Sequence, residues 1–260
     1  MFALKDNITT ERFAIVTVAI IVINVIVYFL LQKGGIFSGP DDTIVVNWGA
    51  IPFEFAHPGN DCVVAGQQIA CGTPAEITSA GLPHPSQPPV WVTAFSSMFM
   101  HGGILHLAGN MLFLWIFGNN VEDSMGPFKF IAFYLLGGLA AIGAQIAIEP
   151  NAAVPTIGAS GAVAAVLGGY ILLYPRARVV TVIFIIFFFT ILELPAMLIL
   201  GFWFVQQVAF GAYGVANPAG GGGGVAYFAH IGGFIFGLAA IKLFASRAKD
   251  YTVPPKYPVY

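Results

Sequence analysis

Charged side chains are scarce in this chain of 260 residues, which has 12 Asp and Glu against 10 Lys and Arg. They make up 8% of the residues, whereas a soluble domain usually carries about 25%, and hydrophobic residues make up 58%. So few charges cannot solvate a globular surface, which makes lipid the expected solvent. The net charge of -2 and the lack of a basic cluster argue against nucleic acid as a partner.

A small-residue cleavage site is also missing after the first apolar run, 13–31. That run is long enough to span a bilayer core of about 30 Å, so we expect a retained helix and no cleavable signal peptide. Six runs have roughly the length of a spanning helix. They are residues 13–31, 104–120, 128–148, 158–174, 194–211 and 225–245.

A seventh apolar run, from Val179 to Leu192, is short for a span and rich in β-branched residues and Phe. This composition suits an interfacial, re-entrant or extended segment as well as a helix. The distribution of Lys and Arg decides against a seventh span, because cytoplasmic segments carry an excess of these residues. With six spans and a cytoplasmic N-terminus, Lys33 alone is outside. The inside set is Lys5, Arg12, Lys129, Arg176, Arg178, Lys242, Arg247, Lys249 and Lys256.

We therefore predict an all-α membrane protein with six transmembrane helices and both termini in the cytoplasm. Residues 1–12 form the cytoplasmic N-terminus, 13–31 the first span, and 32–100 a long extracytoplasmic loop. Residues 101–246 form the core with spans 2 to 6, and 247–260 form a cytoplasmic tail. The loop contains both cysteines, Cys62 and Cys71, which an oxidising compartment would join in a disulfide. Two free thiols are the alternative.

The fourth run begins with Gly158-Ala159-Ser160-Gly161. A serine between small residues is a weak signal, because Ser160, Ala164 and Gly168 repeat every four residues and could simply form a packing ridge. As a nucleophile, Ser160 would need an adjacent base.

The last run supplies a candidate base, His230, in the segment Ala-His-Ile-Gly-Gly. A histidine within a span is costly and therefore suggests function, although a neighbouring hydroxyl or carbonyl could also satisfy it. The fourth and sixth spans both enter from outside. At 1.5 Å per residue, Ser160 and His230 then lie at similar depth, within roughly 10 Å of the outer boundary.

A third cluster, His101, His106 and Asn110, marks the start of the second span. His106 and Asn110 are four residues apart and share a helix face, where the Asn amide could donate to a developing oxyanion. Asn110 could instead hold helices together. A metal site of His101, His106 and His230 is a further alternative, disfavoured by the five-residue spacing of the first two and by the lack of a carboxylate.

These motifs, in this order and spacing, resemble the rhomboid family of intramembrane proteases, of the bacterial type. The resemblance covers residues 91–245 and the first span. The matching segments are the His101/His106/Asn110 cluster, Gly-Ala-Ser160-Gly, Ala-His230-Ile-Gly-Gly-x-x-x-Gly, Val121-Glu122-Asp123 and Tyr174-Pro175-Arg176.

The resemblance implies a six-helix rhomboid-like bundle in a plasma or inner membrane. It implies a Ser160–His230 dyad without a third acidic member, an oxyanion site of His106, Asn110 and the Ser160 N–H, and Gly158 in the wall beside the nucleophile. His101 and Gly161 would have supporting roles. Substrates would be membrane-anchored proteins, cut near the outer boundary at small residues, with no metal or organic cofactor.

The chain departs from the family at two places. Some members have a Tyr four residues after the serine, which stacks on the catalytic histidine, whereas this chain has Ala164. Phe234 or another aromatic residue would then hold His230. Some members also carry a Trp-Arg pair in the first long loop, and this loop has Trp48 and Trp91 but no Arg.

Substrate entry and water access give two further predictions. We expect the fifth span, 194–211, and the 179–192 segment to form a gate, because Pro195 breaks the helix at their junction. Gln206 or Asn217 would supply polar groups near the site. The rival functions are a catalytically silent rhomboid-like protein that binds membrane clients, which retention of Ser160 and His230 disfavours, and a transporter, for which inverted repeats are missing.

Overall fold

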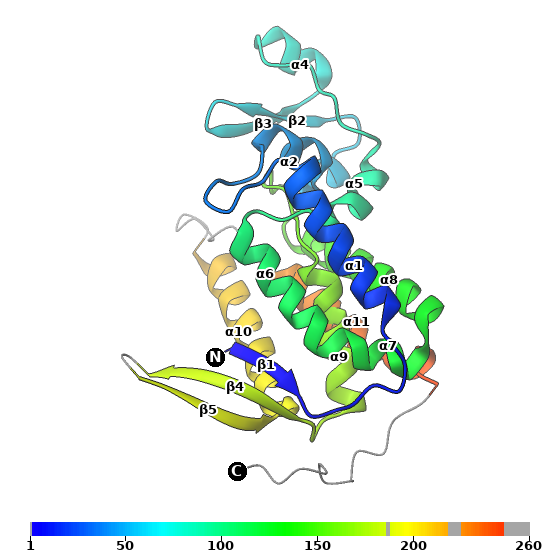
Figure 1. The fold of residues 1–260 in the computed structure, drawn as a ribbon. Coiled ribbons are helices and arrows are strands. Elements are labelled where there is room, and N and C mark those ends of the chain that lie inside the picture. Colours follow the sequence, from blue (N-terminus) through cyan, green and yellow to red (C-terminus); the bar gives the residue numbers. More distant parts are fainter. Residues whose placement is uncertain (1, 186–187, 218–224, 247–260) are drawn as a thin grey trace.

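Helices make up most of the structure (Figure 1). The computed structural model describes residues 2–185, 188–217 and 225–246. Within these residues, four helical stretches are long and apolar enough to cross a membrane: Ile104–Met125, Pro127–Ile148, Ala196–Ala216 and Tyr227–Phe244. The bundle helices are α1 (Ile15–Ile26) with the π-helical turn η1 (Val27–Leu31), α6 (Ile104–Phe113) with η3 (Leu114–Gly118) and α7 (Asn119–Met125), α8 (Pro127–Ile148), α9 (Ser160–Leu173), α10 (Ala196–Ala216) and α11 (Tyr227–Phe244).

The helix α9 lies at the centre of this bundle. All of its residues from Gly161 to Tyr170 are buried, and it packs most extensively against α11 and α8. With 14 residues it is shorter than the four long helices, and so is the apolar stretch Ile15–Leu31. Large apolar side chains such as Leu198, Phe202 and Val205 face outward on α10, which suits contact with lipid.

Small residues bring α9 and α11 into backbone contact. A Cβ atom added at Gly233 would lie 2.1 Å from the Gly161 carbonyl oxygen, and one at Gly168 would lie 2.2 Å from that of Phe234. Such distances leave no room for a side chain, so glycine is required at both positions. The ridge of Ser160, Ala164 and Gly168, which repeats every four residues, therefore does pack closely against a neighbouring helix, α11.

A small antiparallel sheet corrects the prediction of an all-α protein. Its order is β1 (Phe2–Asp6), β4 (Arg178–Ile185) and β5 (Phe188–Pro195), so the N-terminal strand pairs with the 179–192 segment. The β-branched residues of that segment favour an extended backbone, and pairing satisfies its N–H and C=O groups. The fold is mostly helical, with this sheet at one end of the bundle (Figure 1).

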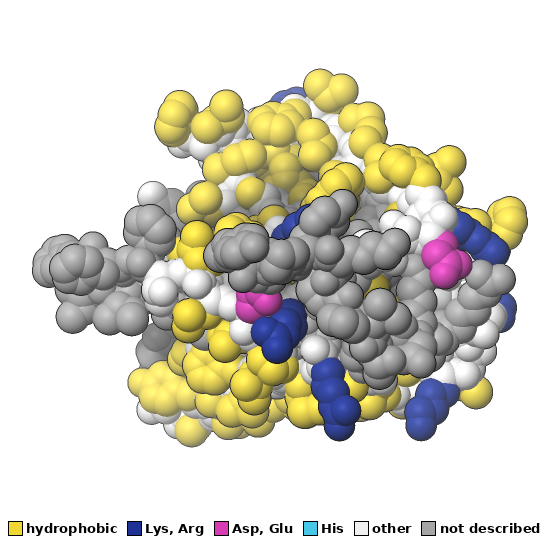
Figure 2. Space-filling model, turned by 60° about the horizontal axis from the view of Figure 1, so that its bottom comes forward, with side chains coloured by type: hydrophobic (Ala, Val, Ile, Leu, Met, Phe, Trp, Pro, Cys, Tyr) yellow, Lys and Arg dark blue, Asp and Glu magenta, His cyan; other side chains and the backbone are white. Residues whose placement is uncertain are grey.

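Exposed basic residues gather at the end of the bundle that carries this sheet. Figure 2 brings this end forward and shows Lys and Arg side chains among hydrophobic ones. The predicted tail 247–260, with three further basic residues, lies outside the described residues. The exposed set consists of Lys5, Arg12, Lys129, Arg176, Arg178 and Lys242.

The predicted loop 32–100 folds at the opposite end of the bundle (Figure 1). Its strands β2 and β3 form a hairpin that a Cys62–Cys71 disulfide closes, as one of the two alternatives predicted. Four short helices surround it. The elements are α2 (Asp42–Trp48), α3 (Pro52–Ala56), β2 (Asp61–Ala65), β3 (Gln68–Gly72), α4 (Pro74–Ser79), α5 (Val90–Ser96) and the 3-10 turn η2 (Ser97–Phe99).

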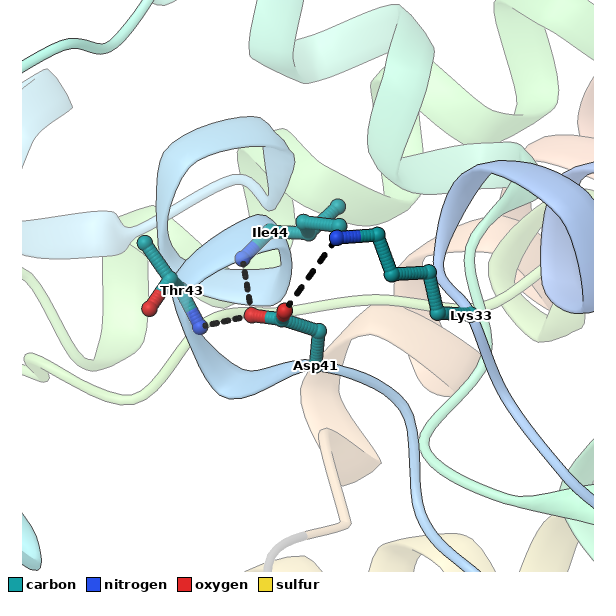
Figure 3. Close-up of polar contacts among 4 residues, drawn as sticks. All are labelled: Lys33, Asp41, Thr43 and Ile44. Atoms are coloured by element: carbon teal, nitrogen blue, oxygen red, sulfur yellow. Dashed lines mark hydrogen bonds and ion pairs between the residues drawn. The ribbon is translucent and has the colours of Figure 1, made fainter.

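One aspartate holds the start of this region in place. Asp41 caps α2 by accepting hydrogen bonds from the N–H groups of Thr43 (3.0 Å) and Ile44 (3.3 Å). Its other oxygen lies 3.8 Å from the Lys33 ammonium nitrogen (Figure 3). An exposed ion pair of this kind contributes at most about 1 kcal/mol. The Asp41 N–H also donates to the Gln32 carbonyl oxygen (2.9 Å), which closes the segment 33–41 into a loop that reaches the site described below.

A buried carboxyl makes the disulfide hairpin sensitive to pH. Glu54 accepts the Cys62 N–H (2.9 Å) and the Gln87 side-chain amide (3.1 Å). Burial raises the pKa of Glu54 from 4.5 to about 7, and the Asp61 carboxylate adds to the rise. Since the folded state binds this proton more tightly than the unfolded state does, its contribution to stability is present below about pH 4.5 and is lost as pH rises through about 7.

We therefore expect the free energy of local opening of strand β2 to fall between about pH 4.5 and pH 7. Hydrogen exchange of peptides covering 61–65, corrected for the intrinsic exchange rates, measures this free energy. In Glu54→Gln, which keeps an acceptor for Cys62 but cannot ionise, the pH dependence should largely disappear. An unchanged pH dependence in that variant would show that another group is responsible.

Candidate active site

Ser160 is the first residue of α9, and the backbone before it depends on glycine. Gly158 has a φ of +127°, a conformation that residues with side chains rarely adopt. A Cβ atom there would also lie 2.8 Å from the His106 ring. Gly158 therefore allows the chain to turn into α9 directly beside that ring. Ser160 is therefore partly buried and lines the cavity described below.

His230 lies in the first turn of α11, within hydrogen-bond distance of Ser160. Its Nε2 atom is 2.8 Å from the Ser160 Oγ atom, across 70 residues of sequence. Both side chains are partly buried. The close approach of α9 and α11 along their glycines produces this juxtaposition. A serine hydroxyl hydrogen-bonded to an imidazole is the arrangement in which the imidazole can remove its proton.

The other imidazole nitrogen of His230 contacts a residue that sequence reasoning missed. Nδ1 lies 2.8 Å from the Oε1 atom of Gln207 on α10. The Trp203 ring, one helical turn earlier, lies with its centroid 5.7 Å from that of His230. The prediction of Gln206 or Asn217 was wrong: Gln206 is the neighbour of the contacting residue, and Asn217 bonds to the Tyr213 carbonyl at the exposed end of α10.

Of the two aromatic supports predicted for His230, Phe234 or another aromatic residue, the structure shows the second, Trp203. Phe234 stacks on Phe204 with centroids 4.5 Å apart and packs against Trp203, so it supports His230 through Trp203. The signal for Trp203 and Gln207 was present in the sequence. An aromatic residue and an amide stand four apart in an apolar span, where a polar side chain suggests a function.

The amide of Asn110 and the ring of His106 face the same cavity as Ser160. His106 Nδ1 accepts the Gly102 N–H (3.3 Å), which leaves Nε2 to carry the ring proton. The Nδ2 atom of Asn110 is buried and has no hydrogen-bond partner among the described residues. A buried donor without a partner is costly, so this amide, on a residue that lines the cavity, would gain from contact with an acceptor.

His101 has a different position from the other members of its cluster. It is fully buried, its ring packs edge-on against that of His106 at 5.1 Å, and it does not line the cavity. The Gln32 side chain bonds both to its N–H (2.9 Å) and to its carbonyl (3.0 Å), which ties η1 to the start of α6. Among the described residues, no three His, Cys, Asp or Glu side chains gather as metal ligands would.

The cavity has a volume of about 930 Å³. Ser160, His230, His106 and Asn110 line it, together with residues 36–39 from the segment that Lys33 and Asp41 hold. Trp203 of the predicted gate lines it as well, whereas no described residue of 179–192 does. That part of the gate prediction was wrong, because the 179–192 segment pairs with β1 at the other end of the bundle.

Comparison with known proteins assigns the region that contains Ser160, His230 and most of the other cavity-lining residues. A family model described as a Rhomboid domain matches residues 88–247, which is more than half of the chain. The chain belongs to the rhomboid family. The resemblance inferred from the motifs is therefore confirmed at the level of the family. The matched rhomboid domain includes Ser160, His230 and the His101/His106/Asn110 cluster, whereas the Cys62–Cys71 hairpin lies outside it.

Several named rhomboid proteins are similar to this one over part of their length. It is 30% identical over 153 residues to Rhomboid protein 1, mitochondrial, of Saccharomyces cerevisiae, covering 56% of this chain and 40% of that protein. It is 37% identical over 78 residues to Rhomboid protease GluP of Bacillus subtilis, covering 30% and 15%. This chain thus spans well under half the length of these relatives.

Proposed function

We propose that this rhomboid protein is an intramembrane serine endopeptidase of the bacterial type. It would hydrolyse peptide bonds of membrane-anchored proteins near the outer membrane boundary. The observation that carries this proposal is the 2.8 Å contact between Ser160 Oγ and His230 Nε2 beside a cavity that Asn110 also lines. A relative over part of the rhomboid domain is named a rhomboid protease.

The chemistry uses a dyad for proton transfer. Ser160 Oγ attacks the scissile carbonyl carbon while His230 Nε2 takes the hydroxyl proton. His230 then gives this proton to the amine of the leaving peptide, and the C–N bond breaks. A water molecule, deprotonated by His230, attacks the resulting ester, and the proton returns to Ser160 as the new carboxylic acid leaves. Only the complete cycle of acylation and hydrolysis returns Ser160 and His230 to their starting protonation states.

The negative charge that develops on the carbonyl oxygen needs fixed donors. Asn110 and His106 line the cavity together with Ser160, and their candidate donors are Asn110 Nδ2 and the Nε2–H of His106. The Ser160 N–H, at the first position of α9, has no partner within the helix. We assign these three groups to the oxyanion site. Donors that are already oriented stabilise the transition state by several kcal/mol, roughly 3 for a single donor.

The exposed basic residues support an orientation with both termini in the cytoplasm. Six of the nine predicted inside residues are described, and all six are exposed. Figure 2 shows Lys and Arg side chains on the end of the bundle that carries the sheet. Lys33, the outside exception, is in the region at the opposite end. We assign the six spans to α1–η1, α6–η3–α7, α8, α9, α10 and α11. Under the positive-inside rule, the cavity and the Cys62–Cys71 hairpin would then lie on the outer side of the plasma or inner membrane.

Cleavage by the purified protein tests the proposal. The protein is reconstituted in liposomes with a panel of single-span substrates that carry Ala, Gly or Ser near the outer boundary, in water enriched in oxygen-18. We expect two fragments whose junction lies near that boundary, with one heavy oxygen in the new carboxyl group. Intact substrates throughout, together with no labelling of Ser160 by a fluorophosphonate, would contradict the proposal.

A further inference from the structure

We propose that Gln207 is a positioning residue for His230, so that the site works as a Ser–His–Gln relay with a neutral third member. This inference rests on the proposed endopeptidase function and deepens it. The three side chains come from α9, α11 and α10, and they form a continuous chain of hydrogen bonds. The two contacts are Ser160 Oγ to His230 Nε2 and His230 Nδ1 to Gln207 Oε1, each 2.8 Å.

The orientation of the Gln207 amide is determined by its own helix. Its Nε2 group donates to the carbonyl oxygen of Trp203 at 3.3 Å. If the amide were turned over, its carbonyl oxygen would face that of Trp203, and two acceptors would repel each other. The nitrogen therefore points to Trp203 and the oxygen Oε1 points to His230. Gln207 is buried, with 8% of its surface exposed, so its amide has little access to water as an alternative hydrogen-bond partner.

This orientation selects one tautomer of His230. Oε1 can only accept a hydrogen bond, so Nδ1 must carry the ring proton. Nε2 is then the nitrogen with a free lone pair, which is what it needs to accept the Ser160 hydroxyl proton. The opposite tautomer would place two lone pairs against each other at the Gln207 contact. The amide therefore keeps His230 in the form that can act as a base.

Trp203 and Gln207, both on α10, hold the His230 ring in place of the aromatic residue that some family members have at position 164. Ala164 is fully buried, and its methyl group lies against the glycine backbone of α11, 3.4 Å from where a Cβ of Gly233 would be. Ala164 presents only a methyl group there and cannot cover the His230 ring. Trp203 covers the His230 ring instead, and Gln207 fixes its rotation.

An amide suits this position better than a carboxylate would. A buried charge without a full set of partners costs several kcal/mol. Of the described cavity-lining residues, His106 and His230 are the only ones that titrate readily, and no Lys or Arg is among them to balance an anion. A neutral acceptor fixes the tautomer without that cost. Gln207 itself does not line the cavity and lies behind His230, away from the substrate.

The decisive experiment compares Gln207→Leu with the matched control Gln206→Leu. Each change replaces an amide by an apolar side chain at adjacent positions of α10, but only one removes the His230 contact. We expect Gln207→Leu to lower kcat by a factor on the order of 10 to 100, with little change in KM, since a lost orienting partner affects the transition state. Gln206→Leu should keep the kcat of the unaltered protein. Gln207→Glu, which keeps an acceptor oxygen, should recover part of the loss.

The tautomer gives a readout that does not depend on cleavage. Nitrogen-15 NMR of labelled histidine, with the His230 signal assigned through His230→Asn, should show a neutral ring with its proton on Nδ1. In Gln207→Leu, part of the signal should move to the other tautomer. A proton on Nε2 in the unaltered protein would overturn the inference, whether or not the variants fold.

The two proposals fail in different ways. If Ser160→Ala cleaves substrate like the unaltered protein, the dyad itself is wrong. If Ser160→Ala is inactive while Gln207→Leu keeps the full kcat and the same tautomer, the endopeptidase proposal stands and the positioning role of Gln207 is refuted. Thermal unfolding of each variant in detergent shows whether a lost activity reflects a lost fold. Should Gln207→Leu not fold, Gln207→Asn, whose shorter side chain cannot reach His230 in the same geometry, takes its place.

Discussion

Replacing Ser160 by alanine is expected to lower the rate of substrate cleavage by a factor of about 10⁴ or more. The same loss is expected for His230→Ala, because the hydroxyl is a weak nucleophile without a base 2.8 Å away. The measurement is the initial rate of cleavage of a single-span substrate in liposomes at saturating substrate. Fluorophosphonate labelling should disappear in Ser160→Ala and fall strongly in His230→Ala.

The double variant makes this prediction sharper. Residues that act as one unit have non-additive effects, so Ser160→Ala/His230→Ala should be no slower than either single variant. Ser124→Ala is a suitable control, since it removes another buried hydroxyl, bonded to the Val121 carbonyl in α7, and should leave the rate unchanged. Two single losses that multiply in the double variant would mean that the residues act independently.

Replacing Gly237 by alanine is expected to cause the largest loss of stability. A Cβ atom there would lie 2.0 Å from the Ala165 carbonyl oxygen and 2.9 Å from the Gly169 nitrogen. Both are backbone atoms of α9, which cannot rotate away as a side chain could. The helices would have to separate along their whole contact, at a cost of about 3 kcal/mol or more. Thermal unfolding in detergent should show a strong decrease in the midpoint.

Gly143→Ala in α8 is the matched control for this effect. A Cβ atom at Gly143 would meet no other atom within 4 Å among the described residues. Alanine also favours a helix over glycine by up to about 1 kcal/mol. Gly143→Ala should therefore keep or slightly raise the unfolding midpoint. Equal midpoints for the two variants would contradict the close α9–α11 packing, and with it the geometry that brings His230 to Ser160.

Much of the architecture could be predicted from the sequence because lipid imposes simple rules. Apolar length predicted the helical segments of the bundle, and the four-residue repeats of small residues predicted where α9 and α11 approach each other. The sequence indicated that the 179–192 segment could be extended, but it did not identify β1 as the strand that pairs with it. β1 and β4 are separated by more than 170 residues, as the pair Phe2 and Val182 illustrates, and composition shows only that such a segment can be extended.

The sequence identified Ser160 and His230 as a candidate pair and predicted that they lie at similar depth, and the tertiary structure shows the contact between them. Order, spacing and the charge bias brought the two residues to a common level. Gln206 and Gln207 show what sequence could not decide. They are adjacent, yet successive helical residues point about 100° apart, so only one of them can face α11. Which one does depends on how α10 is rotated against its neighbour. Tertiary packing alone determines that rotation, and it decided that Gln207 orients His230.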